Sequence, residues 1–503
     1  MGAPAAAQSP PPSSRESDQG AGWGCRPGTY VRDMPPHPPR IFWFSARILW
    51  ETRNDFLAKA LGDPTDTSRE RWTAGLSDEE LTVDLGLRDF SFLLLGDTGE
   101  GCAPQYALIP ALAAKGRDTA FMFICSDVLY PIGNVNDYVD KFYRPYTDYH
   151  SPIYAIPGNH DWYDGLEAFM RHFCNRPPLP ATDDRMLSKE HVRDLLWHKP
   201  ARFDPDTFVR GLEYRPHPRQ RQPVPQRGPY YVIDTERLRL VGIDTGIKKD
   251  LDAAQGAWLL RVSAGSTKPK VILTGTPIYV NNLYQPLEIA GGGPPGFPTV
   301  DSIVRHPDHN YVAVIGGDLH NYQRYPVVVD GRRIEHIVSG GGGAFMHATH
   351  TIPRITPETC GGVTEDEFRC YPLRRDSLAM FSRLLDERFG GHGLFTLTPD
   401  EAATYLSERL GIAPTRPIGN AASRSLPRQL AAAGALLMPS GPRFHKWLSP
   451  FFAWDTPPFF KNFLRLDVSG RGLDISCYGV TGCLAHESEP ALEDRVPTIP
   501  LAG

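Results

Sequence analysis

Acidic, amide and imidazole side chains suited to metal binding stand directly after four apolar runs of this sequence. These residues are Asp97, Asp127, Asn159, His160, Asp318 and His320. Carboxylates, amides and imidazoles are ligands for hard and borderline divalent ions. Asp127 lies between the other early positions and could bridge two ions. Two ions about 3.5 to 4 Å apart can clamp a displacement at phosphorus and supply the attacking hydroxide, so the pattern predicts phosphoester hydrolysis.

The apolar runs before these residues are typical of strands buried on both faces of a helix-covered sheet. FSFLLL ends at Asp97, AFMFIC precedes Asp127, and PIYAIP precedes Asn159. In open α/β sheets, ligands bind beyond the carboxyl ends of the strands. Because all of the polar residues fall at such ends, their position alone marks a candidate site.

The stretch between Asp127 and Asn159 carries apolar and aromatic residues at every third or fourth position. These are Val135, Tyr138, Phe142, Tyr146 and Tyr149. That spacing predicts one face of a helix, with Asn134 available as its N-cap. We therefore expect a strand, a helix, a second strand and a polar turn across residues 126–165.

Composition and length limit the classes of protein to which this chain can belong. The chain has 503 residues, of which 41% are hydrophobic, and a formal net charge of −5. It can build one large or two ordinary domains, and it has no basic field for nucleic acid or anionic membranes. No apolar run reaches the ~18 residues of a membrane span, and no export signal is evident, so we expect a cytoplasmic enzyme. Eight cysteines without a CxxC pair indicate mostly buried or free thiols.

The organisation along the chain follows from changes in composition. Nine of the 49 prolines fall within residues 1–40, which predicts a disordered leader. Beyond it we expect a peripheral N-terminal element at 41–89, a core at 90–343 with an insertion at about 164–228, an irregular insertion or cap at 344–450, C-terminal strands returning to the core at 451–485, and a tail at 486–503.

Four motifs give the chain a family resemblance. GDTG at 96–99, SDVLY at 126–130, GNHD at 158–161 and GDLHNY at 317–322 resemble, in order and spacing, the motifs of calcineurin-like metallophosphoesterases. The missing His in the first motif and the Tyr in the second are most similar to the purple acid phosphatase pattern. The resemblance implies a four-layer αββα sandwich of two mixed β-sheets, with helical and irregular insertions.

The resemblance also implies the roles of the site residues. A first metal would be held by Asp97, Asp127, Tyr130 and His320, and a second by Asp127, Asn159 and two histidines. His160 would be the general acid, with Asp161 orienting it. The implied reaction is hydrolysis of a small phosphomonoester or phosphodiester by in-line attack of a metal-bound hydroxide, supported by one or two Mn, Fe or Zn ions.

The sequence departs from that pattern at the second metal. Gly275 and Asp318 stand where the resemblance implies histidines. Asp318 can still bind a metal and would favour Mn or Mg, and we expect the second ion to be weakly held. Water or a distant histidine could complete the site, the candidates being His306, His309, His347 and His350.

Two alternatives to a small-molecule phosphoesterase stay open. One is a catalytically degenerate scaffold that acts as a binding or regulatory module, which the missing histidine at Gly275 suggests. The other is a nuclease, which the negative net charge and the lack of a basic stripe argue against. The sequence carries no indication of the oligomeric state.

Overall fold

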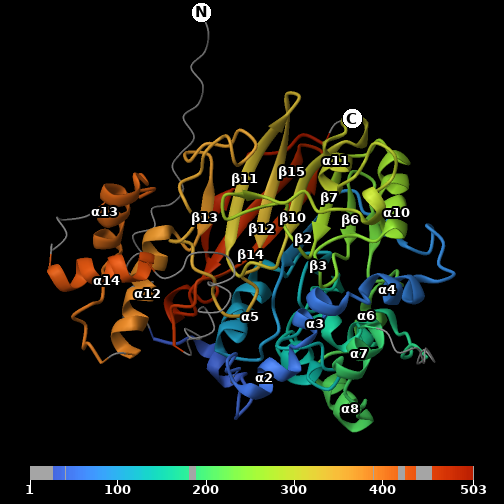
Figure 1. Ribbon diagram of the computed structural model, residues 1–503, viewed down its shortest axis with the longest axis horizontal. Helices are drawn as coiled ribbons and strands as arrows, with labels where there is room; N and C mark the ends of the chain where they lie inside the picture. Colours follow the sequence, from blue (N-terminus) through green and yellow to red (C-terminus); the bar gives the residue numbers. More distant parts are fainter. Residues whose placement is uncertain are drawn as a thin grey trace, which may run out of the picture.

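The computed structural model describes residues 26–39, 41–180, 189–388, 390–416, 418, 425–437 and 456–501. Two large β-sheets stand at its centre with helices around them (Figure 1). Each sheet combines parallel and antiparallel strand pairs. The predicted α/β fold with two mixed sheets is therefore confirmed.

The first sheet has eight strands in the order β1 (Thr82–Asp84), β5 (Tyr231–Asp234), β6 (Arg239–Ile243), β7 (Lys270–Thr274), β10 (Tyr311–Gly316), β12 (Arg332–Ser339), β11 (Tyr322–Val329) and β13 (Arg369–Tyr371). The second has six strands in the order β16 (Ala491–Arg495), β15 (Gly472–Val480), β14 (Lys461–Ser469), β2 (Phe90–Leu95), β3 (Phe121–Ile124) and β4 (Ile153–Ala155). A small hairpin joins β8 (Tyr279–Val280) to β9 (Leu283–Tyr284).

The strands that precede the polar motifs lie where the apolar runs predict them. β3, β7 and β10 are buried along their whole length, and β2 is buried at all but one position. β2, β3 and β4 run parallel to one another, so the residues that follow them meet at one edge. β5 and β6 pair antiparallel as a hairpin.

Apolar clusters define the layers. One lies between the sheets and includes Phe92, Phe121, Leu273 and Ile315. The opposite face of β2 and β3 packs on α5 (Ala103–Lys115) and on the aromatic residues after Asp127. The opposite face of the eight-stranded sheet packs on α10 (Ala253–Ala264) and α11 (Val300–Arg305). These three apolar clusters show that the core has four layers in the order helices, sheet, sheet, helices.

The remaining helices lie in the N-terminal and inserted segments. They are α2 (Ala46–Glu51), α3 (Asn54–Leu61), α4 (Thr65–Thr73), α6 (Glu167–Cys174), α7 (Lys189–Leu196), α8 (Pro205–Tyr214), α9 (Pro218–Arg221), α12 (Arg374–Arg388), α13 (Pro399–Leu410) and α14 (Leu426–Leu437). Short 3₁₀ turns are η1 (Thr29–Arg32), η3 (Asp161–Asp164), η4 (Ala290–Gly292), η5 (Pro307–His309) and η7 (Leu484–His486).

The helix predicted between Asp127 and Asn159 is wrong as a regular element. Only the π-helix η2 (Val139–Tyr143) forms there, within a series of turns. Pro145 follows closely, and because it lacks an N–H it cannot continue a helical ladder. The five apolar and aromatic residues are nevertheless all buried. Their spacing therefore predicted correctly which side chains pack inward, although they do not form a regular α-helix.

The predicted leader is too long. Residues 1–25 and 40 lie outside the described residues, but residues 26–39 are ordered against the C-terminal hairpin. Gly28 N donates to Gly482 O at 3.0 Å, and Tyr30 is buried against Phe459. Cys483, at the same place, is disulfide-bonded, whereas Cys125, Cys174 and Cys477 are buried free thiols.

Three short strands lie outside the predicted core segments. β1 falls within 41–89, β13 within 344–450 and β16 within 486–503, and each extends a main sheet. α12 packs with α13 and α14 on a small apolar core at one side of the sheets (Figure 1). The segment 344–450 is thus more regular than predicted, although residues 438–450 are not described.

The insertion at about 164–228 protects the free edge of the six-stranded sheet. Gln226 bonds to both the N–H and the C=O of Ala155 in β4, and Gln222 donates to Ile153 O. Side-chain amides thereby replace a missing neighbouring strand. Among the described helices, none is both long and apolar enough to cross a membrane.

Candidate metal centre

The hydroxyl of Tyr130 is the point at which side chains from both sheets converge. It lies 2.8 Å from Asp97 Oδ1, 2.8 Å from Asp127 Oδ2 and 3.0 Å from His320 Nε2. Asp97 and Asp127 follow β2 and β3, whereas His320 follows β10 of the other sheet. The structure therefore brings together the four residues that the sequence assigned to one metal.

Close backbone approaches set this meeting point. Gly96 N donates to Ser339 O at 2.8 Å, which ties the end of β2 to the end of β12. A Cβ at Gly340 would stand 2.5 Å from Asp97 Oδ2, so only glycine fits there. The glycine run at 340–343 thus lies where the chain passes close to neighbouring backbone and side chains.

The atoms around the Tyr130 hydroxyl include more hydrogen-bond acceptors than protons to share among them. The Tyr130 hydroxyl has a single proton but faces two carboxylate oxygens and the Nε2 atom of His320. His320 Nδ1 lies 2.7 Å from Phe345 O, and because a carbonyl can only accept, Nδ1 carries the proton and Nε2 carries a lone pair. The Asp97 carboxyl is fully buried, and a hydrogen bond from the Ser126 side chain lowers its pKa only in part. A cation at this point would satisfy all of these groups.

The electrostatics of the cluster also favour a bound cation. Burial, followed by the charges of Asp127 and Asp318, raises the pKa of Asp97 well above its usual value. Burial and the neighbouring His347 and Lys461 lower the pKa of His320, which keeps its ring neutral. Histidine binds a metal as the neutral imidazole, and aspartate binds it as the deprotonated carboxylate. Within the described residues, no group of three or more His, Cys, Asp or Glu side chains is arranged as a metal site.

His160 is oriented by the main chain. Its Nδ1 lies 2.7 Å from Pro131 O and, because a carbonyl only accepts, Nδ1 carries the proton of the neutral ring. Asp161, expected to orient it, accepts at Oδ2 from the backbone N–H groups of Val128 and Gly158, both at 3.0 Å. These bonds hold the second and third motifs together, which gives Asp161 a positioning role.

Trp43 lies over the centre, although it was not predicted from the sequence as a site residue. Its ring contacts those of Tyr130, His160 and Phe345 edge-on, with centroid separations of 5.3–5.9 Å. The only local signal is that Trp43 belongs to the aromatic stretch that begins the peripheral element. The residues that meet beneath it are all buried, so Trp43 and Phe345 shield the site from water.

The second metal position differs from the expected one. Asp127 Oδ1 accepts from His160 N at 2.7 Å, and Asn159 Nδ2 donates to Tyr163 OH at 2.8 Å. Asp318 Oδ2 forms an ion pair with Lys249 Nζ. Lys249 belongs to no motif, so no signal in the sequence could have selected it.

The distant histidines do not gather at Gly275. His347 accepts from His320 N at 2.8 Å, on the side of the first metal, and His350 bonds to Ser377 Oγ. His306 and His309 pack on Phe297. A Cβ at Gly275 would stand 3.1 Å from Thr245 Oγ1, so the position is also crowded.

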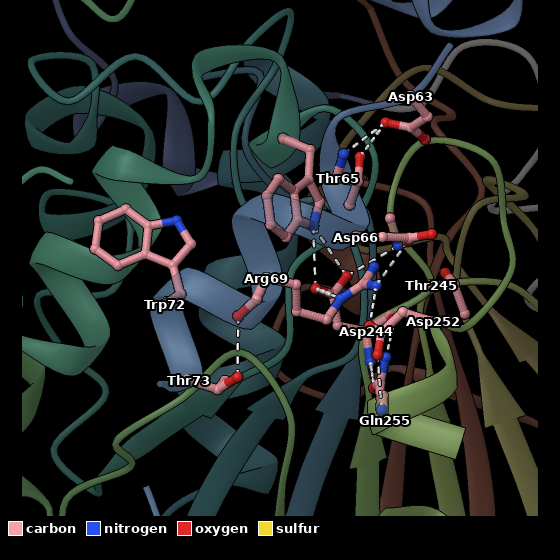
Figure 2. Close-up of polar contacts among 12 residues, drawn as sticks. Asp63, Thr65, Asp66, Arg69, Trp72, Thr73, Asp244, Thr245, Asp252 and Gln255 are labelled. Atoms are coloured by element: carbon pink, nitrogen blue, oxygen red, sulfur yellow. Dashed lines mark hydrogen bonds and ion pairs between the residues drawn. The ribbon is translucent and has the colours of Figure 1, made fainter. Parts of the chain in front are cut away.

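A buried network around Arg69 supports this side of the centre (Figure 2). Arg69 bonds to Asp244 at 2.9 Å and to Asp252 at 2.5 Å. Trp162, in the segment that follows the third motif, donates to Asp244 Oδ1 at 2.9 Å. The network therefore links α4, the segment after β6 and the end of the third motif.

Comparison with known proteins gives a family match over part of the chain. Residues 90–322 match the family model described as "Calcineurin-like phosphoesterase". The chain therefore contains a calcineurin-like phosphoesterase domain, as its motifs indicate. No curated protein matches the sequence significantly.

Solved structures of the same kind are distant. GAP50, described as the anchor in the inner membrane complex of Plasmodium, is 10% identical with a TM-score of 0.38, covering 83% of this chain and 90% of that chain. Purple acid phosphatase PPD1 from yellow lupin (Lupinus luteus) seeds is 12% identical with a TM-score of 0.34, covering 83% and 58%. TT1561 of Thermus thermophilus is 13% identical with a TM-score of 0.26, covering 50% and 89%.

Proposed function

We propose that this chain is a metal-dependent phosphoesterase acting on a small phosphomonoester or phosphodiester. The observation that carries the proposal is the convergence of Asp97, Asp127 and His320 on the Tyr130 hydroxyl, where three acceptors share one proton. The family match supports the reaction class. When bound, a divalent ion polarises a phosphoryl oxygen and makes water nucleophilic near neutral pH.

The side chains of this site have distinct roles in the proposed reaction. Asp97, Asp127, Tyr130 and His320 would hold the ion, and Asn159 and Asp318 would border the neighbouring position. His160 gives a proton from Nε2 to the leaving-group oxygen, while the Pro131 carbonyl keeps its ring in place. Trp43 and Phe345 exclude water, which strengthens the electrostatic interactions inside the site.

Metal content and hydrolysis, measured on the same samples, test the proposal. The wild-type chain should carry an Mn, Fe or Zn ion by elemental analysis and hydrolyse nitrophenyl phosphate or bis(nitrophenyl) phosphate. Asp127→Asn should lose both properties, because it removes a charge shared by the site. Asp148→Asn, at an exposed position, is the matched control and should change neither.

A second pair of variants isolates the tyrosine. Tyr130→Phe should lower metal content, because its hydroxyl lies between the two carboxylates. Tyr138→Phe removes an equally buried hydroxyl that has no hydrogen-bond partner, and it should keep the metal. A wild-type chain that binds no ion on titration with Mn, Fe or Zn would refute the proposal.

The second candidate function is a binding module without turnover. The ion pair between Lys249 and Asp318 favours it, since it occupies a position where the resemblance implies a metal. A chain that binds an ion but hydrolyses no ester in a broad panel would establish this alternative.

The location of the protein in the cell stays a prediction. Cytoplasmic placement was expected from the sequence, whereas the disulfide bond at Cys483 is more usual in oxidising compartments. Fractionation of cells that express the full chain decides between them.

A further inference from the structure

The ion pair between Lys249 and Asp318 lies beside the proposed metal and is partly shielded from solvent. The Lys249 side chain is 33% exposed and that of Asp318 is 10% exposed. Asp318 follows β10 in the same motif as His320, and its charge acts on Asp97. The ammonium group therefore belongs to the electrostatics of the centre.

Both partners adopt an uncommon backbone conformation. Lys249 has a φ of +67° and Asp318 has a φ of +67°, in the left-handed region that favours glycine. Residues held in this region concentrate at functional sites, where the surrounding structure maintains them. The two side chains are thus directed toward each other by strained backbone at both ends.

The surrounding structure that maintains Lys249 is the Arg69 network. Lys249 lies in the segment between Asp244 and Asp252, and Arg69 bonds to both of these carboxylates (Figure 2). Asp250 N donates to Thr245 O at 3.1 Å and closes the turn. One buried guanidinium therefore fixes both ends of the segment that carries the ammonium.

We propose that the Lys249 ammonium takes the place of the second metal, so that the centre combines one metal ion with one lysine charge. This inference rests on the proposed function. One divalent ion and one ammonium balance the charges of Asp97, Asp127 and Asp318, whereas a second divalent ion would be repelled by Lys249. Gly275 offers no side chain to that second ion.

This arrangement gives Lys249 a part in substrate binding. An ammonium at this position can contact a phosphoryl oxygen as a point charge, which is a common role of lysine in phosphate sites. The substrate class is then an ester whose phosphate bridges the metal and Lys249. Asp318 positions the ammonium in place of binding a metal.

The number of Mn ions bound per full-length chain tests the inference, using equilibrium dialysis and elemental analysis. Wild type should bind about one ion at saturating Mn, and Lys249→Met should bind about two, because the repulsion is removed. Lys249→Arg keeps the charge and should stay at one. Lys248→Met, at the exposed neighbouring lysine, is the matched control and should also stay at one.

The outcomes separate the two levels of the proposal. Two ions on wild type, or one ion on Lys249→Met, would overturn the role of Lys249 and leave the proposed function intact. No ion on wild type would overturn both. Thermal melting checks that each variant folds. If Lys249→Met does not fold, Lys249→Gln removes the same charge and replaces it in the test.

Discussion

At the residue scale, hydrogen bonds to main-chain carbonyls decide which histidine nitrogen faces the site. Phe345 O fixes His320 and Pro131 O fixes His160, in both cases at Nδ1. In the proposed reaction, the Nε2 atom of His320 would bind the metal and that of His160 would face the substrate. The same kind of main-chain contact therefore fixes the tautomer of both rings.

His160→Ala tests the acid role. It should lower turnover of alkyl phosphates by about 10²- to 10⁴-fold, and turnover of nitrophenyl esters much less, because a good leaving group needs no proton. Steady-state rates on the two ester classes measure the contrast. Metal content should be unchanged, and an equal loss on both esters would indicate a positioning role instead.

At the element scale, segments remote in sequence form the surroundings of the centre. The stretch before α2 supplies Trp43, α4 supplies Arg69, and the segment between β6 and α10 supplies Lys249. None of them belongs to the four motifs. The strand ends provide the candidate ligands, and these additional segments supply residues that surround them.

Trp43→Ala should widen access to the site, because its ring contacts Tyr130, His160 and Phe345. We expect kcat/KM for bis(nitrophenyl) phosphate to rise severalfold relative to that for methyl phosphate, since the bulkier ester gains more from the space. Phe42→Ala, at an exposed neighbouring position, is the control. An unchanged ratio would show that Trp43 does not limit access.

Arg69→Ala should destabilise the fold by about 3 to 5 kcal/mol, because it leaves Asp244 and Asp252 buried without their partner. The control is Arg261→Ala, which removes an exposed ion pair with Asp78 and should cost less than about 1 kcal/mol. Urea unfolding measures both changes. A small effect at Arg69 would mean that the network tolerates the loss of its cation.

At the scale of the whole molecule, the sheets bury ionisable groups far from the centre. His336 in β12 is buried, and neither ring nitrogen has a hydrogen-bond partner. Burial, with a smaller effect from Arg305, lowers the pKa of His336 to about 3. Such a group links global stability to pH.

The sign of that linkage follows from proton binding. Below pH ~6.5 the unfolded chain protonates this histidine and the folded chain does not, until the pH approaches 3. The proton linkage of His336 therefore costs no free energy of unfolding above pH ~6.5. Below that pH, the free energy of unfolding falls by up to about 1.4 kcal/mol per pH unit. His336→Leu should flatten this part of the curve in urea unfolding, whereas exposed His150→Leu should not. Parallel curves for wild type and His336→Leu would contradict the prediction.

The sequence by itself predicted the buried strands and the polar residues that follow them, and the family resemblance of its motifs implied the two-sheet fold and the set of residues at Tyr130. Strands buried on both faces give continuous apolar runs, and a parallel sheet places the residues that follow its strands at one edge. Both signals are local, so Asp97 and Asp127 could be recognised without the structure. Their assignment as metal ligands stays a prediction until an ion is measured.

Only the tertiary structure decided what surrounds that centre. Lys249 and its partner Asp318 are 69 residues apart, and Arg69 and Asp244 are 175 apart, so no local pattern contains either pair. β1 and β13 have three residues each, too few for a periodic signal, and exist through hydrogen bonds to neighbouring strands. The replacement of a second metal by an ammonium is likewise a proposal about two side chains that meet only in the folded chain.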